Sequence, residues 1–178
     1  MKGRGKMPTE TFLNLDPAKQ SRIVQACLHE FGAHPLSEAQ VAPIVKESKI
    51  ARGSFYKYFE DLTDAYQYIY GIALREIHKG IRPPDRGKVQ VSDYLAQVTN
   101  FLDQSQQSGY YDLIRQHLLH NEERIAPRPQ AVPMELSPQN WAVGVLVHTT
   151  IKECVRDPKD QETKLDRLAV VLTKLLAE

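Results

Sequence analysis

The segment from residue 44 to residue 59, IVKESKIARGSFYKYF, limits the possible folds of this chain more than any other stretch. Its pattern predicts the end of one short helix, a turn with Ile50 as its buried anchor, and a second short helix over residues 51–59. Phe55 and Phe59 are four residues apart, so they share one face of that second helix and can anchor it. Two short helices joined in this way form a helix-turn-helix.

The other face of the second helix is polar, and nothing apolar accounts for the clustering of its side chains. The glycine within it lets the backbone approach a phosphate closely. The first residues of such a helix usually reach base edges in the major groove of DNA. Tyr58 fits a DNA contact and the core equally well. We predict a DNA-contacting set made of Arg52, Gly53, Ser54, Tyr56, Lys57 and Tyr58, with Gln40, Lys49 and Thr63 from the adjoining segments.

Two helices are expected before the turn. Asp16 followed by Pro17 predicts the start of the first, because aspartate caps a helix and proline suits its first position. Gly32 is a plausible left-handed cap at its end. The second helix is expected to start near Gln40, which leaves Pro43 in the first turn, where its missing N–H costs no hydrogen bond.

The rest of the chain also has helical spacing of its apolar residues. Helices are predicted over about residues 62–77, 91–108 and 110–123, followed by one that begins at Pro138 with Ser137 as its cap. A C-terminal helix carries a leucine stripe at i, i+3, i+4 and i+7 spacing. No segment keeps a strand pattern, so the sequence predicts an all-α protein.

The helix-turn-helix region resembles the TetR-like (TetR/AcrR) family of transcriptional regulators over about residues 16–66. The chain departs from the family pattern at Ser48-Lys49, where the family often has Ala-Gly, at Leu62, where it often has a phosphate-binding lysine, and near Val41, where a threonine is common. The matching residues are Ile23, Ala26, Cys27, Phe31 and Gly32 in the first helix, Ile44-Val45, and the run from Ser48 to Phe59.

The resemblance implies an N-terminal three-helix, helix-turn-helix DNA-binding domain followed by a helical ligand-binding and dimerisation domain. We expect a basic flexible arm over residues 1–15, the DNA-binding domain over 16–61 and the effector-binding and dimerisation domain over 62–178. The implied function is a ligand-responsive regulator, most simply a repressor, that binds a palindromic operator as a homodimer. Its partners would be double-stranded DNA, a second copy of the chain and a small-molecule effector of unknown identity.

Within the predicted effector-binding and dimerisation domain, the residues expected to line the pocket or to form the dimer contact are apolar, aromatic or histidine side chains at inward-facing helical positions. For each aromatic residue taken singly, ordinary core packing is the favoured interpretation. The pocket candidates are Tyr66, Tyr70, Tyr94, Phe101, Tyr111, His117, Trp141 and His148. The candidate dimer residues, from a helix that is apolar nearly all round and from the leucine stripe, are Val143, Val147, Ile151, Leu165, Leu168, Leu172 and Leu175.

The charge distribution is consistent with one end of the molecule meeting phosphate. The net charge is only +1, but residues 1–60 hold nine Lys and Arg against six Asp and Glu. Three of these basic residues, Lys2, Arg4 and Lys6, could reach DNA as an arm or could be solvated. No apolar run approaches the roughly 18 residues of a membrane span. Cys27 and Cys154 lie in apolar patterns typical of buried thiols in a reducing cytoplasm.

Other function classes find little support in the sequence. There is no glycine-rich phosphate loop, nucleophile elbow or His-Glu-x-x-His motif, so we expect neither an enzyme nor a cofactor. His117 and His120 are three residues apart, but no second pair completes a metal site, and no metal is expected. The alternative is a helical protein–protein interaction module that has lost specific DNA binding, for which the missing lysine at position 62 is the best support.

Overall fold

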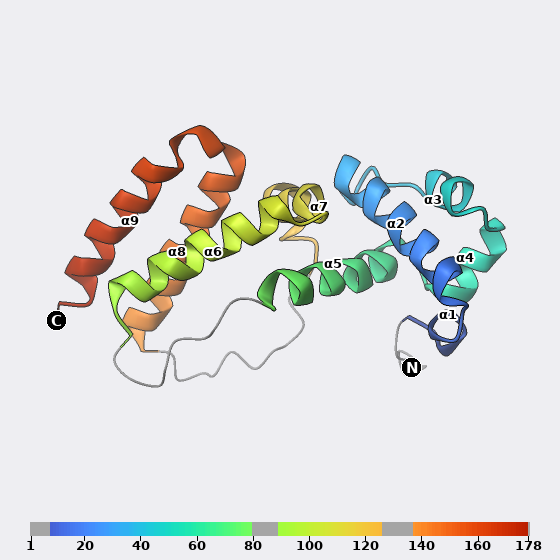
Figure 1. Ribbon diagram of the computed structural model, residues 1–178, viewed down its shortest axis with the longest axis horizontal. Coiled ribbons are helices and arrows are strands. Elements are labelled where there is room, and N and C mark those ends of the chain that lie inside the picture. The colour runs from blue at the N-terminus through green and yellow to red at the C-terminus, as the bar shows by residue number, and fades with distance from the viewer. Residues whose placement is uncertain (1–7, 80–88, 126–136, 178) are drawn as a thin grey trace. The chain divides into compact units, whose positions relative to one another are not determined.

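The computed structural model describes residues 8–79, 89–125 and 137–177, and within these ranges the chain is helical with no strand. The predicted all-α class is therefore confirmed. Figure 1 shows the elements in chain order. They are α1 (Glu10–Leu13), α2 (Pro17–Ala33), α3 (Val41–Ser48), α4 (Arg52–Tyr58), α5 (Leu62–His78), α6 (Val91–Gln107), α7 (Tyr111–Gln116), the π-helical turn η1 (His117–Asn121), α8 (Pro138–Arg156), the 3-10 turn η2 (Pro158–Asp160) and α9 (Gln161–Leu175).

The chain divides into two compact units. Unit 1 consists of residues 1–76 and 109–125, and unit 2 of residues 77–108 and 126–178. Unit 1 holds α1 to α4, most of α5, and α7 with η1, so its core is completed by a helix from far along the sequence. Helix α2 contacts both α3 and α7. Side chains that lie wholly within this core include Ile23, Phe31, Ile44, Phe55, Phe59, Tyr66 and Leu113.

Three predicted helix starts are confirmed by the caps that the structure shows. The Asp16 carboxylate accepts hydrogen bonds from the backbone N–H groups of Ala18 and Lys19, at 3.0 and 3.2 Å, ahead of Pro17. Helix α3 begins directly after Gln40, which places its proline in the first turn. The Ser137 hydroxyl accepts from the N–H of the residue three positions on, at 3.2 Å, ahead of Pro138.

Gly32 does not end α2 in a left-handed conformation, so that prediction is wrong. The helix continues through Ala33 and ends at His34, which is extended, and no described glycine has a positive φ. A Cβ atom added at Gly32 would lie 3.1 Å from the Cβ of Asp112 in α7. The glycine therefore leaves space where α2 and α7 approach closely, and no left-handed turn of the chain calls for it.

The expected flexible arm over residues 1–15 also needs correction. Residues 10–13 form α1, which Thr9 caps, and Phe12 is completely buried. A side chain of this size that loses all contact with water fixes its segment to the core. Lys2, Arg4 and Lys6, the basic residues of the predicted arm, lie outside the described residues.

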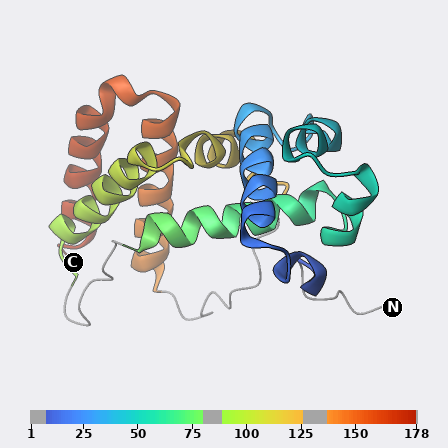
Figure 2. The same ribbon diagram turned by 45° about the vertical axis from the view of Figure 1, so that its right-hand side comes forward.

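Unit 2 is built around α6, α8 and α9. Figures 1 and 2 show α8 and α9 side by side as an antiparallel pair, and α6 contacts both of them. Its buried apolar residues include Val98, Leu102, Val143, Cys154, Val155, Leu168 and Leu172. Among the described residues, the helices include none that is long and apolar enough to cross a membrane.

Candidate nucleic-acid interface

Helix α4 has the two faces that the sequence predicts. Phe55 is completely buried, and Phe59, which follows the helix, is buried as well. On the other side Tyr56 is 49% exposed, and Lys57 is exposed beside it. Arg52 and Gly53 are also exposed, and Ser54 is partly so. The structure therefore places five of the six predicted α4 contact residues where a large partner can reach them.

Tyr58 is the exception, and the prediction that it contacts DNA is wrong. Only 4% of it is exposed, and its ring meets that of Phe12 edge-on, with 5.8 Å between centroids. The sequence did not separate the two interpretations of Tyr58, because its partner comes from α1, a helix that the sequence did not predict. A buried tyrosine in an aromatic cluster stabilises the helix and cannot meet DNA.

The turn before α4 is a left-handed helix end. Lys49 has φ 56° and ψ 44° and is the non-glycine residue with positive φ among those described. The N–H of Ile50 donates to the carbonyl of Val45 at 3.1 Å, and that of Lys49 points to the carbonyl of Lys46 at 3.4 Å. This pair of bonds is the Schellman pattern, in which glycine is the usual left-handed residue. The lysine side chain at this position is exposed.

The two outer members of the predicted set lie on the surface. Gln40 is exposed at the start of α3, and its N–H donates to the Glu30 carboxylate at 2.7 Å. Thr63 is exposed at the start of α5, between two carboxylates. There Asp64 accepts from the N–H of Glu60 at 3.0 Å, and burial together with nearby acidic residues raises the pKa of Asp64. These carboxylates oppose a phosphate near Thr63.

Three of the eight pocket candidates meet in the interior of unit 1. The Tyr66 hydroxyl lies 3.1 Å from Nδ1 of His117, and the imidazole stacks on Tyr70 with 3.8 Å between ring centroids. Asn121, which the sequence did not single out, donates to the Tyr66 hydroxyl at 3.2 Å and accepts from the N–H of Leu36 at 2.9 Å. This buried network ties α5 and η1 to the loop between α2 and α3.

Burial raises the pKa of the two tyrosines further above neutral pH. It raises the pKa of Tyr66 to about 12, against which the hydrogen bond from Asn121 acts. It raises the pKa of Tyr70 as well, with further contributions from Tyr66 and Glu122. Both phenols therefore keep their protons at neutral pH, and Tyr66 is available as a hydrogen-bond donor.

The remaining pocket candidates do not form an interior site in the structure. Tyr111 is half-buried on α7, and Tyr94 is half-buried on α6. Phe101 is half-buried, and its ring lies 5.9 Å from that of His78 within unit 2. Trp141 is 63% exposed and His148 is exposed, so the prediction that both face inward is wrong. Each lies on the side of α8 that the protomer leaves open to solvent.

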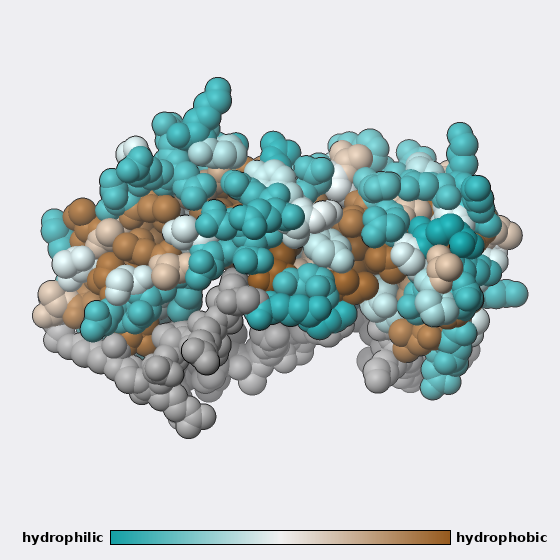
Figure 3. Space-filling view, in the orientation of Figure 1, coloured by the Kyte–Doolittle hydropathy of each residue, from teal (hydrophilic) through white to brown (hydrophobic). Residues whose placement is uncertain are grey.

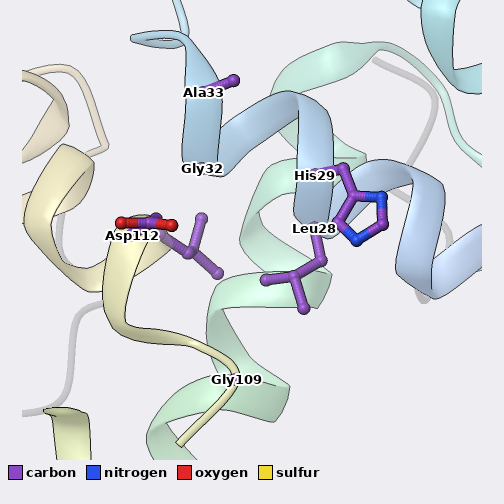
Figure 4. Close-up of a pocket in the computed structure, with 7 residues that line it drawn as sticks. Leu28, His29, Gly32, Ala33, Gly109 and Asp112 are labelled. Atoms are coloured by element: carbon purple, nitrogen blue, oxygen red, sulfur yellow. The ribbon is translucent and has the colours of Figure 1, made fainter.

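One open pocket lies in unit 1 between α2 and the start of α7, with a volume of about 210 Å³ (Figure 4). Asp112 and His29 lie on opposite sides of it (Figure 4), and Leu28 and Leu113 contribute apolar lining. None of the predicted pocket residues lines it. His29 also lies 2.5 Å from the Glu47 carboxylate of α3, which joins α2 to the helix-turn-helix.

The predicted dimer residues divide into two groups. Val143, Leu168 and Leu172 are at most 3% exposed and pack inside the protomer, so these three cannot lie on an interface. Val147, Ile151, Leu165 and Leu175 are half-buried. Figure 3 shows hydrophobic surface on unit 2. The large apolar side chains that α8 and α9 leave exposed are Trp141, Val145, Val170 and Val171.

Comparison with known proteins identifies the fold. No family model matches the chain, and no curated protein does. A TetR family transcriptional regulator from Chloroflexus aurantiacus J-10-FL superimposes with a TM-score of 0.60 at 19% identity, over 96% of this chain and 97% of that one. The fatty acid degradation regulator FadR from Bacillus halodurans gives a TM-score of 0.46 at 17% identity, over 89% and 96%. On the first of these similarities, the chain has the fold of a TetR family transcriptional regulator.

Proposed function

We propose that this protein is a DNA-binding transcriptional regulator whose recognition helix is α4. The observation that carries the proposal is the division of α4 into a buried aromatic face and an exposed polar one. Arg52 and Lys57 are exposed and supply charge for phosphates, and Tyr56 on the same helix is 49% exposed. A helix-turn-helix places such a helix in the major groove, where side chains read base edges.

The proposed regulator acts as a homodimer on a palindromic operator. Trp141 and Val145 lie one helical turn apart on α8, and Val170 and Val171 are exposed on α9. Exposed apolar residues on two paired helices support a four-helix contact with a second copy. A two-fold dimer would present its recognition helices about 34 Å apart, and the operator would share that symmetry.

The proposed regulator also responds to a small molecule, most simply as a repressor that releases DNA. The network of Tyr66, His117 and Asn121 supports this, because its last member holds the backbone of Leu36 beside the helix-turn-helix. A ligand that binds one arrangement of this network better than another would shift the DNA-binding equilibrium.

Selection from a pool of random duplexes tests the proposed function. We expect the wild-type protein to enrich one sequence with two-fold symmetry. The matched comparison is Tyr56→Ala, which removes a half-exposed side chain of α4 and should enrich that sequence weakly. A pool that stays random, with uniformly weak binding to all duplexes, would instead favour an interaction module without specific DNA binding.

A further inference from the structure

The last turn of the recognition helix is held by a residue that precedes the helix-turn-helix. The Thr9 N–H donates to the carbonyl of Tyr58 at 3.1 Å, and the Thr9 hydroxyl donates to the carbonyl of Lys57 at 2.8 Å. Both carbonyls belong to the C-terminal turn of α4, where a helix has no backbone donors of its own left to satisfy them. Figure 2 shows α1, which Thr9 caps, next to α4.

The segment that carries Thr9 is fixed to the core of unit 1. Phe12 of α1 lies among three aromatic rings, with centroid distances of 5.8 Å to Tyr58, 5.0 Å to Phe59 and 5.5 Å to Tyr68. Its carbonyl also accepts a hydrogen bond from the Gln20 side chain of α2, at 3.1 Å. Through Phe12, three residues further on, α1 is held against α2 and α5, so Thr9 links the recognition helix to both of them.

Helix α4 depends on such outside support. It has seven residues, and no side chain caps its N-terminus. Helices this short are not stable by themselves, so their direction is set by what packs against them. Lys57, one of the residues proposed to contact DNA, is also the residue whose carbonyl the Thr9 hydroxyl holds.

We propose that Thr9 is a positioning residue for DNA recognition, which fixes the orientation of the exposed face of α4 through the carbonyls of Lys57 and Tyr58. The proposal rests on the proposed function of α4. Thr9 is only half-buried, so water can replace its hydroxyl at the carbonyl of Lys57. Loss of the hydroxyl therefore loosens the end of the helix without unfolding unit 1.

The test compares wild-type protein with Thr9→Val, which keeps the β-branched shape, and Thr9→Ser, which keeps the hydroxyl. Two quantities are measured in the full-length chain. The first is hydrogen exchange of the α4 amides without DNA. The second is affinity for the duplex that the wild type enriches and for a scrambled duplex of equal length. For Thr9→Val we expect faster exchange at the end of α4 and about fivefold weaker binding to the enriched duplex.

Thr9→Val should bind the scrambled duplex as the wild type does, and Thr9→Ser should match the wild type in every measurement. The proposal is overturned if exchange in Thr9→Val is unchanged, if both duplexes lose affinity equally, or if the serine variant behaves like valine. If the wild type itself does not distinguish the two duplexes, the proposed function fails and the recognition role of Thr9 fails with it. The exchange difference would then remain as a purely structural result.

Discussion

Replacing Lys49 with glycine should stabilise the protein. This residue occupies the left-handed region at φ 56°, where a side chain costs about 1–2 kcal/mol because its Cβ crowds the following carbonyl. Glycine removes that strain, but it also makes the unfolded chain more flexible, which costs about 0.5–1 kcal/mol. The net gain is about 0.5–1 kcal/mol, or a rise of about 1–4 °C in the melting temperature for a chain of this length.

The matched control for this change is Lys49→Ala. Alanine also loses the lysine charge but keeps a Cβ atom in the strained conformation, so it should give no stabilisation. Urea unfolding followed by circular dichroism measures both variants against the wild type. The reasoning is refuted if Lys49→Gly is no more stable than Lys49→Ala, because the backbone would then not carry the strain.

The same two variants report on DNA contact. Both remove one exposed positive charge, so in each the logarithm of affinity should fall less steeply with the logarithm of salt concentration, by about one unit of slope. A slope equal to that of the wild type in both variants would remove Lys49 from the predicted contact set. Stability and salt dependence together separate the backbone role of this residue from its charge.

Three further outcomes are expected. Tyr56→Ala should weaken operator binding about tenfold or more with little change in stability, whereas Phe55→Ala should lose about 3–5 kcal/mol of stability in urea unfolding; equal destabilisation would contradict the two-faced helix. Val170→Glu should give folded monomers in light scattering, whereas Leu172→Glu should unfold unit 2. If Val170→Glu remains a folded dimer, the dimer interface does not include Val170. Burial raises the pKa of the Cys27 thiol from 9.0 to about 12, so at pH 8 the folded protein should hold about 10³-fold less thiolate at this residue than the unfolded chain. Mass spectrometry should therefore show slow labelling of the native thiol, and rapid labelling would contradict this expectation.

Helix boundaries followed from local chemistry wherever a short-range rule decided them. Asp16 with Pro17, Ser137 with Pro138, and the requirement that Pro43 lie in a first turn each gave the right start. Gly32 was misassigned because a glycine near a helix end can serve either a left-handed backbone turn or the close approach of another helix. The structure shows the long-range cause, the approach of Asp112 from another helix, which no nearby residue indicates.

The candidate surfaces were harder to predict, because periodicity locates a buried face without saying what buries it. The leucine stripe of α9 predicted a dimer contact, yet Leu168 and Leu172 are covered within their own protomer. The apolar residues left for a partner, Trp141 and Val170 among them, lie outside that stripe. Tyr58 was undecided for the same reason, since its partner on α1 comes from a segment without a strong helical pattern.

The most direct test of the central claim is the ratio of affinities for the enriched duplex and a scrambled duplex at physiological salt. If α4 reads base edges, the wild type should bind the enriched duplex at least about 10³-fold more tightly. Arg52→Ala should reduce this ratio, because the Arg52 side chain is exposed at the N-terminal end of α4, where base contacts are usually made. A ratio near one for the wild type, with both affinities falling in parallel as salt rises, would contradict the account.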